Sequence, residues 1–146
     1  MEIVPVELKI LVPTPNGTAI FLGNDEKVFV IYVDNVAGTA LADTLSGVHK
    51  ERPMTHDLIA HVFTGFGVNV ERVVINHADN GIFHARLILS MRNELGTKLV
   101  ELDARPSDAL ILASREKKPV FVAREVFAAV DDMSEVLRKI TEQQKP

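Results

Sequence analysis

The stretch ELDARPSDALILA, Glu101–Ala113, changes from a β-type run to an apolar helical run at an Arg-Pro pair. Lys98–Leu102 is rich in apolar residues and predicts a short strand that leads into Asp103. Proline is tolerated in the first turn of a helix, because its missing N–H would have no partner there. The spacing therefore predicts a helix that opens at the Arg-Pro pair and ends near Arg115.

A hairpin is predicted immediately before this strand. Val68–Asn76 and Ile82–Met91 are both β-rich, and they flank the turn HADNG, His77–Gly81. Together with Lys98–Leu102 they form three consecutive strands. His77 and His84 flank the turn and are expected to face each other across the hairpin.

Three strands are also predicted at the start of the chain. Alternating apolar residues indicate a strand over Val4–Val12, and PTPNG, Pro13–Gly17, predicts a tight turn whose Asn-Gly pair supplies positive φ angles. Thr18–Leu22 returns as the second strand. The third, VFVIYV at Val28–Val33, is apolar on both faces, so we expect it in the centre of the sheet with cover on each side.

Helices follow each set of strands. Asp34 is predicted to cap a helix that ends at Gly47, and Thr55 to cap a second one that ends at Gly65 or Gly67. The elements expected after the Arg105–Arg115 helix are a short strand at Val120–Val122, a short helical piece at Arg124–Val130, and an amphipathic terminal helix capped by Asp131 or Asp132.

This order of elements predicts an α+β fold, in which a largely antiparallel or mixed sheet packs with three to four helices. The 146 residues fit a single domain. Residues 1–130 are expected to form its body, and residues 131–146 a C-terminal amphipathic helix and frayed tail of the same domain, with fraying at Gln143–Pro146.

The composition excludes several classes of site. The chain has no cysteine, so it has no disulfide, zinc-thiolate site or thiol nucleophile, and we expect a cytoplasmic protein. Its longest apolar run is too short to cross a bilayer, and no membrane contact is expected. A net charge of -4 with scattered basic residues predicts weak to moderate, local contacts with nucleic acid. No nucleotide-binding glycine motif is present, and no organic cofactor is expected.

A similar Arg-Pro motif lies earlier in the chain, RPMTHDLIA at Arg52–Ala60. In chain order it is the first motif and Arg105–Ala113 is the second, and two interpretations of the pair are open. In the structural one, Thr55 and Ser107 cap helices and the following aspartates meet the positive end of the helix dipole. Asp103 is an alternative cap. In the functional one, two helix starts lie side by side and their charged groups hold a phosphodiester.

RPMTHDLI together with ELDARPSDALILA resembles the bifunctional nuclease domain of bacterial and plant proteins, over about Val4–Val130. The alanine-rich helix that ends in Leu45–Gly47 is also similar to the family. Asn35–Gly38 departs from it, since the family tends to carry a glutamate among small residues there. The resemblance implies an α+β fold, often in a homo-oligomer, and a nuclease acting on DNA and RNA.

On this basis the leading hypothesis is hydrolysis of phosphodiester bonds in DNA or RNA, assisted by Mg²⁺ or Mn²⁺. The implied catalytic residues are His56, Asp57, Asp103 and Asp108, with His56 as the proton-transfer group and the three aspartates as metal ligands. The implied substrate-binding residues are Arg52, Thr55, Arg105 and Ser107.

The alternative hypothesis is a non-enzymatic anion-binding or regulatory domain in a homo-oligomer. A homo-oligomer, most simply a dimer, is expected because the apolar strand Val28–Val33 needs cover on both faces and few helices are predicted to supply it.

Overall fold

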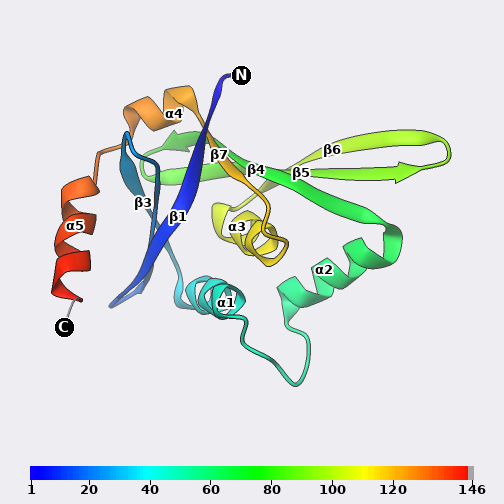
Figure 1. The fold of residues 1–146 in the computed structure, drawn as a ribbon, viewed down its shortest axis with the longest axis horizontal. Helices are drawn as coiled ribbons and strands as arrows, with labels where there is room; N and C mark the ends of the chain where they lie inside the picture. The colour runs from blue at the N-terminus through cyan, green and yellow to red at the C-terminus, as the bar shows by residue number, and fades with distance from the viewer. Residues whose placement is uncertain (145–146) are drawn as a thin grey trace.

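Two antiparallel meanders joined by one short strand form the sheet of this protein (Figure 1). The computed structural model describes residues 1–144, and within them seven strands run in the order β3-β2-β1-β7-β4-β5-β6. The first meander contains β1 (Ile3–Thr14), β2 (Gly17–Gly23) and β3 (Val28–Val33), and the second contains β4 (Val68–Asp79), β5 (Ile82–Asn93) and β6 (Gly96–Ala104). Strand β7 (Val120–Ala123) pairs antiparallel with β1 and parallel with β4, which makes the sheet mixed.

Five helices accompany these strands in the described part of the chain: α1 (Asn35–Ser46), α2 (Thr55–Phe66), α3 (Pro106–Arg115), α4 (Arg124–Ala129) and α5 (Ser134–Gln143). Figure 1 shows α1, α2 and α3 on one side of the strands, with α5 beyond β1 and β3 on the other. The predicted α+β single domain with a mixed, mostly antiparallel sheet is confirmed. No helix within residues 1–144 is long and apolar enough to cross a membrane.

Helix α3 lies at the centre of the main core. The five residues Ala109–Ala113 are at most 5% exposed, and the helix packs against α1, β4 and β5. Burying one leucine or isoleucine side chain contributes about 1.5–3 kcal/mol, so this segment holds the helix firmly. The N-terminal end of α3 is therefore a fixed platform for the polar residues of the second Arg-Pro motif.

Helix α1 lies close to β2 because Gly38 has no side chain. A Cβ atom there would be 2.0 Å from Thr18 Oγ1. The predicted ends of the helix are confirmed: the Asp34 carboxylate accepts a hydrogen bond of 2.8 Å from the Ala37 N–H, and Gly47 ends the helix with a φ of 67°. This packing brings the start of α1 beside the start of α3.

The prediction that Val28–Val33 lies in the centre of the sheet is wrong, because β3 is an edge strand paired with β2. Its apolar character on both faces has another cause. Phe29 and Ile31 point into the main core, whereas Val28 and Val30 pack with residues of and before α5 such as Leu137. The chain itself covers both faces of this strand, so the strand gives no support to the prediction of a partner subunit.

The predicted caps of the later helices also need correction. Met54, not Thr55, precedes the first residue of α2, and Arg105 precedes α3. Asp103 lies within β6 and caps no helix. Before α5 the N-cap is Met133, although the carboxylate of Asp132 accepts a 2.9 Å hydrogen bond from the Ser134 N–H. The predicted fraying covers Gln143, which is helical, and residues 145–146, which lie outside the described residues.

The two predicted hairpins form through different turns. Asn80 and Gly81 have φ angles of 50° and 78°, as a two-residue turn between right-twisted strands requires. In the first hairpin Thr14 pairs with Gly17, and the expected positive φ angles are not found. Gly17 is required there for space, because a Cβ atom would lie 2.0 Å from the carbonyl oxygen of Val33.

Candidate functional site

The second Arg-Pro motif places an arginine and an aspartate side by side at the start of α3. Arg105 Nε donates to Asp108 Oδ2 at 2.9 Å, and Nη2 donates to Asp108 Oδ1 at 3.2 Å. Its third nitrogen, Nη1, lies 3.9 Å from Asp34 Oδ2, too far for a hydrogen bond. The Arg105 side chain is 66% exposed, so this nitrogen has room to bind a ligand.

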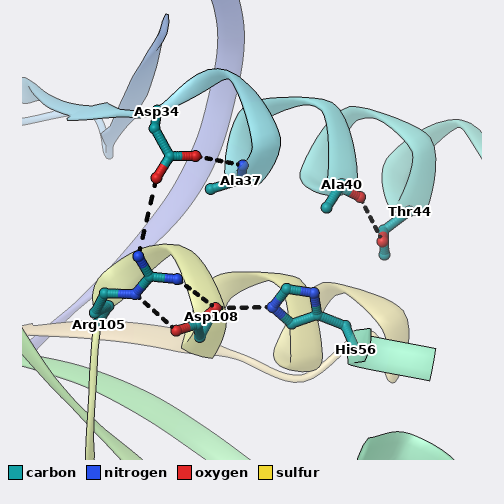
Figure 2. A network of polar contacts seen from close by, with 7 residues as sticks. All are labelled: Asp34, Ala37, Ala40, Thr44, His56, Arg105 and Asp108. Carbon is teal, nitrogen blue, oxygen red and sulfur yellow. Dashed lines mark hydrogen bonds and ion pairs between the residues drawn. The ribbon is translucent and has the colours of Figure 1, made fainter. Parts of the chain in front are cut away.

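His56 completes the cluster from the first turn of α2 (Figure 2). Its Nε2 lies 2.8 Å from Asp108 Oδ1. An ionised carboxylate only accepts hydrogen bonds, so Nε2 must carry the hydrogen and donate it. In the neutral ring Nδ1 then has the free lone pair, and Figure 2 shows this second nitrogen on the side of the ring away from Asp108, toward α1.

Arg105 and His56 stabilise the ionised form of Asp108. Partial burial raises the pKa of its carboxyl, but the hydrogen bonds from Arg105 and His56 outweigh that effect and hold the pKa below the ordinary value. The same contact with Asp108 raises the pKa of the Arg105 guanidinium. Asp108 is therefore an anion at neutral pH and can orient the His56 ring.

Asp57 belongs to a different cluster, in which its carboxylate is buried and its two cationic partners are partly exposed. One carboxylate oxygen, Oδ2, lies 2.7 Å from Lys50 Nζ and accepts a 2.8 Å hydrogen bond from the Met54 N–H. The other accepts from Arg115 Nη1 at 2.5 Å. The hydrogen bond from Lys50 is the largest of the effects that lower the pKa of Asp57 to about 2. These contacts tie the start of α2 to the C-terminal end of α3.

The remaining predicted site residues lie apart from both clusters or at their edges. Asp103 lies on β6, is 72% exposed, and is 4.0 Å from Arg86 Nη1. Arg52 is exposed in the loop before α2 and makes no ion pair within residues 1–144. Thr55 is exposed at the first position of α2, and Ser107 is buried at the second position of α3.

The three aspartates expected to bind a divalent metal do not converge. Asp57 is occupied by two cationic side chains and a backbone N–H, Asp108 by Arg105 and His56, and Asp103 lies on a strand. Among the described residues, no group of three or more His, Asp or Glu side chains is arranged to hold a metal ion. The predicted set of ligands does not fit a shared metal site, and Asp57 is better described as a structural anchor.

Three residues of these clusters were not singled out as site residues by the sequence. Asp34 was predicted only as a helix cap, yet it also flanks Arg105. Lys50 and Arg115 neutralise Asp57, and Arg115 is 58 positions away from it in the sequence. The basic residue in the last turn of α3 was visible as a helix-end preference, but no local spacing pairs it with Asp57.

Comparisons with known proteins agree with the resemblance. The family model of the bifunctional nuclease domain matches residues 20–134. Two Mycobacterium tuberculosis proteins, the uncharacterized proteins MT1877 (strain CDC 1551 / Oshkosh) and Rv1829 (strain ATCC 25618 / H37Rv), are each 32% identical to this chain over 105 residues. That alignment covers 72% of this chain, and the chain spans 60% of the length of each relative. With both Arg-Pro motifs inside the matched region, the chain belongs to the bifunctional nuclease domain family.

Proposed function

We propose that this protein hydrolyses phosphodiester bonds of DNA or RNA at the cluster formed by His56, Asp108 and Arg105. The observation that carries the proposal is the 2.8 Å contact between His56 Nε2 and Asp108, with Arg105 bound to the same carboxylate. A histidine oriented by a carboxylate is an efficient general base, and an arginine beside it can bind the anionic group that reacts.

In the proposed reaction His56 Nδ1 takes a proton from a water molecule as the water oxygen attacks phosphorus. The bond from phosphorus to the leaving ester oxygen breaks, and that oxygen takes up a proton from solvent or from the imidazolium. Asp108 accepts the hydrogen bond from Nε2 throughout, which fixes the tautomer and stabilises the positive charge that His56 gains.

Arg105 has the role of phosphate ligand in this scheme. Two of its nitrogens are used by Asp108, and Nη1 is the one directed toward Asp34 without a hydrogen bond to it. A phosphate oxygen that accepts from Nη1 gains a charge-assisted hydrogen bond. Replacing Arg105 with lysine keeps the charge but loses the planar fork, so we expect weaker substrate binding, seen as a raised KM, in a folded protein.

The test is a nuclease assay on highly purified protein with single-stranded and double-stranded DNA and RNA. Each substrate is assayed with Mg²⁺, with Mn²⁺ and with a chelator, which measures any metal requirement directly. We expect His56→Ala to lower the rate by about 100-fold to 10,000-fold, the usual contribution of a general base. The matched control is His61→Ala, an exposed histidine on the same helix. Equal activity in all three proteins would attribute the cleavage to a contaminant and refute the proposal.

A non-enzymatic domain that binds a small anion, in a homo-oligomer, is the second candidate. The exposed guanidinium of Arg105 at a helix start favours it, because that arrangement binds anions without any chemistry. This candidate predicts that His56→Ala retains the affinity for phosphate and nucleotides and that no cleavage occurs in the wild type. Light scattering at micromolar concentration tests the assembly, against 16.1 kDa for one chain.

A further inference from the structure

A pocket of about 400 Å³ opens beside His56, between α1 and the start of α2. This volume falls within the range of about 300–1,000 Å³ that small-molecule sites occupy. Its walls are apolar side chains from α1, from α3 and from the loop before α2: Val36, Ala40, Ile111 and Met54. Figure 2 shows Ala40 and Thr44 on the side of α1 that faces His56.

The apolar walls of this pocket suit a flat ring. Val36 and Met54 are 81% and 61% exposed and are accessible to a ligand, whereas Ile111 is 1% exposed. Proteins that bind an unpaired nucleobase hold its faces between apolar or aromatic side chains and read its edge with hydrogen bonds. The pocket has walls of this kind, and its polar groups define the edge it can accept.

Asp43 gives the pocket an unsatisfied acceptor. Its carboxylate lines the cavity, is half-buried, and makes no ion pair or side-chain hydrogen bond within residues 1–144. Thr44 adds a second acceptor, because its hydroxyl donates to the Ala40 carbonyl at 2.8 Å and the oxygen keeps its two lone pairs. Lys50 also lines the pocket, and its ammonium has donors beyond the one that faces Asp57.

We propose that this pocket binds an unpaired guanine base next to the phosphodiester that is cleaved, so that the substrate class is single-stranded nucleic acid. The proposal rests on the proposed function above for the position of the phosphate. Guanine presents two neighbouring donors, N1–H and the N2 amino group, followed by the O6 acceptor on its Watson–Crick edge. An ionised carboxylate accepts from both donors at once, and an ammonium donates to O6.

Adenine and cytosine match these groups less well. Adenine has an acceptor at N1 where guanine has a donor, and cytosine has an acceptor at N3. Either acceptor would face the carboxylate of Asp43 and leave two lone pairs opposed. The Watson–Crick edge is free only in a single strand or a flipped nucleotide, so a paired duplex cannot fill the pocket without losing base pairs.

The position of His56 connects base binding to cleavage. The ring lines the pocket and also contacts Asp108. A nucleotide whose base lies in this pocket would have its own phosphate near His56, and Arg105 belongs to the same cluster through Asp108. Base recognition would then select which bond is cut, without any change in the catalytic groups.

The first experiment measures binding, separately from catalysis. Titration calorimetry or NMR titration compares guanosine, inosine and adenosine 5′-monophosphates on the wild type, on Asp43→Asn, and on Asp25→Asn, an exposed aspartate in the turn between β2 and β3. We expect guanosine monophosphate to bind about 10-fold more tightly than adenosine monophosphate, the discrimination of one good bidentate contact. Inosine, which lacks the N2 amino group, should fall between them. Asp43→Asn should lose the preference, and Asp25→Asn should retain it.

The second experiment maps the cleavage sites on single-stranded oligonucleotides of mixed sequence. Cleavage beside guanine that becomes random in Asp43→Asn supports the proposal. Cleavage without base preference, together with equal binding of the three nucleotides, overturns the guanine pocket and leaves the nuclease proposal intact. If the wild type binds guanosine monophosphate selectively but cleaves nothing, the nuclease proposal is refuted. The pocket is then a nucleotide-binding site of a non-enzymatic domain.

Discussion

The two Arg-Pro motifs have similar sequences, but their aspartates lie in different environments. In the first, the side chain of Asp57 is 10% exposed and bound by Lys50, Arg115 and a backbone N–H. In the second, the side chain of Asp108 is 33% exposed and shares its oxygens between Arg105 and His56. One aspartate is a structural anchor and the other lies in an accessible cluster, although both occupy the first turn of a helix.

The difference shows that burial and interaction partners, and not the local sequence, determine whether an aspartate is available to a ligand. A carboxylate with two cations and an N–H has few lone-pair directions left for a ligand. The first motif contributes to the candidate site through His56, the residue immediately before the buried aspartate. The anchor holds the start of α2 in place, and the neighbouring histidine is thereby directed toward Asp108.

The contrast between the two motifs is tested most directly by comparing the unfolding free energies of Asp57→Asn and Asp108→Asn. We expect Asp57→Asn to lower the free energy of unfolding by about 3 kcal/mol, because it leaves two cations without their partner in a largely buried place. Asp108→Asn should cost less than about 1 kcal/mol, since its contacts are closer to solvent. Urea unfolding monitored by circular dichroism measures both. Equal losses in the two variants would mean that the motifs do not differ in the way described.

Acid pH should remove the contribution of Asp57 in a defined range. Its folded-state pKa of about 2 lies below the ordinary value of 3.8, so the stabilisation is present above about pH 4 and is lost as the pH falls toward 2. The shift corresponds to about 2 kcal/mol. The measurement is the difference in unfolding free energy between the wild type and Asp57→Asn at several pH values from 6 to about 2. A difference that stays constant across this range contradicts the assignment.

The two cations of the anchor should be unequal and coupled. Lys50 supplies the largest effect on the pKa of Asp57, so we expect Lys50→Met to cost about 1 kcal/mol and Arg115→Met somewhat less. The double variant should cost less than the sum of the singles, because Asp57 can protonate or recruit water once both are gone. A double-mutant cycle by thermal denaturation reports this coupling, and simple additivity would argue against a shared partner.

The smallest effect is expected at Arg52, the arginine of the first motif. It is exposed and has no ion pair within the described residues, so Arg52→Ala should change the unfolding free energy by less than about 0.5 kcal/mol. Its use in substrate binding is tested in the same protein by the KM of the nuclease assay. A large loss of stability would show that this arginine has a structural partner, as Asp57 does.

Much of the fold was predictable from local patterns. The cap at Asp34 and the end at Gly47 follow from short-range hydrogen bonding and the positive φ of glycine. The hairpin after Val68 was predicted with His77 opposite His84, and the two rings lie 5.2 Å apart. These features depend on residues a few positions apart, for which sequence spacing contains the relevant geometry.

Features that depend on distant residues were not predictable in the same way. The apolar edge strand β3 owes one of its covered faces to the region of α5, about 100 positions later in the chain. His56 meets Asp108 across 52 positions, and Asp57 meets Arg115 across 58. The residues of the candidate cluster come from the two motifs, but only packing of α2 against α3 determines which aspartate His56 contacts.

The short strand β7 has a consequence for how the protein acquires its structure during synthesis. Each meander is made of neighbouring segments and can form soon after it leaves the ribosome. Within residues 1–144, the two meanders are connected in the sheet only through Val120–Ala123, which is translated after both. The continuous sheet can therefore form only after the four residues of β7 have been synthesised. Limited proteolysis of ribosome-stalled chains should show protection of the sheet rising sharply once those residues have emerged, and protection complete before that point would contradict this order.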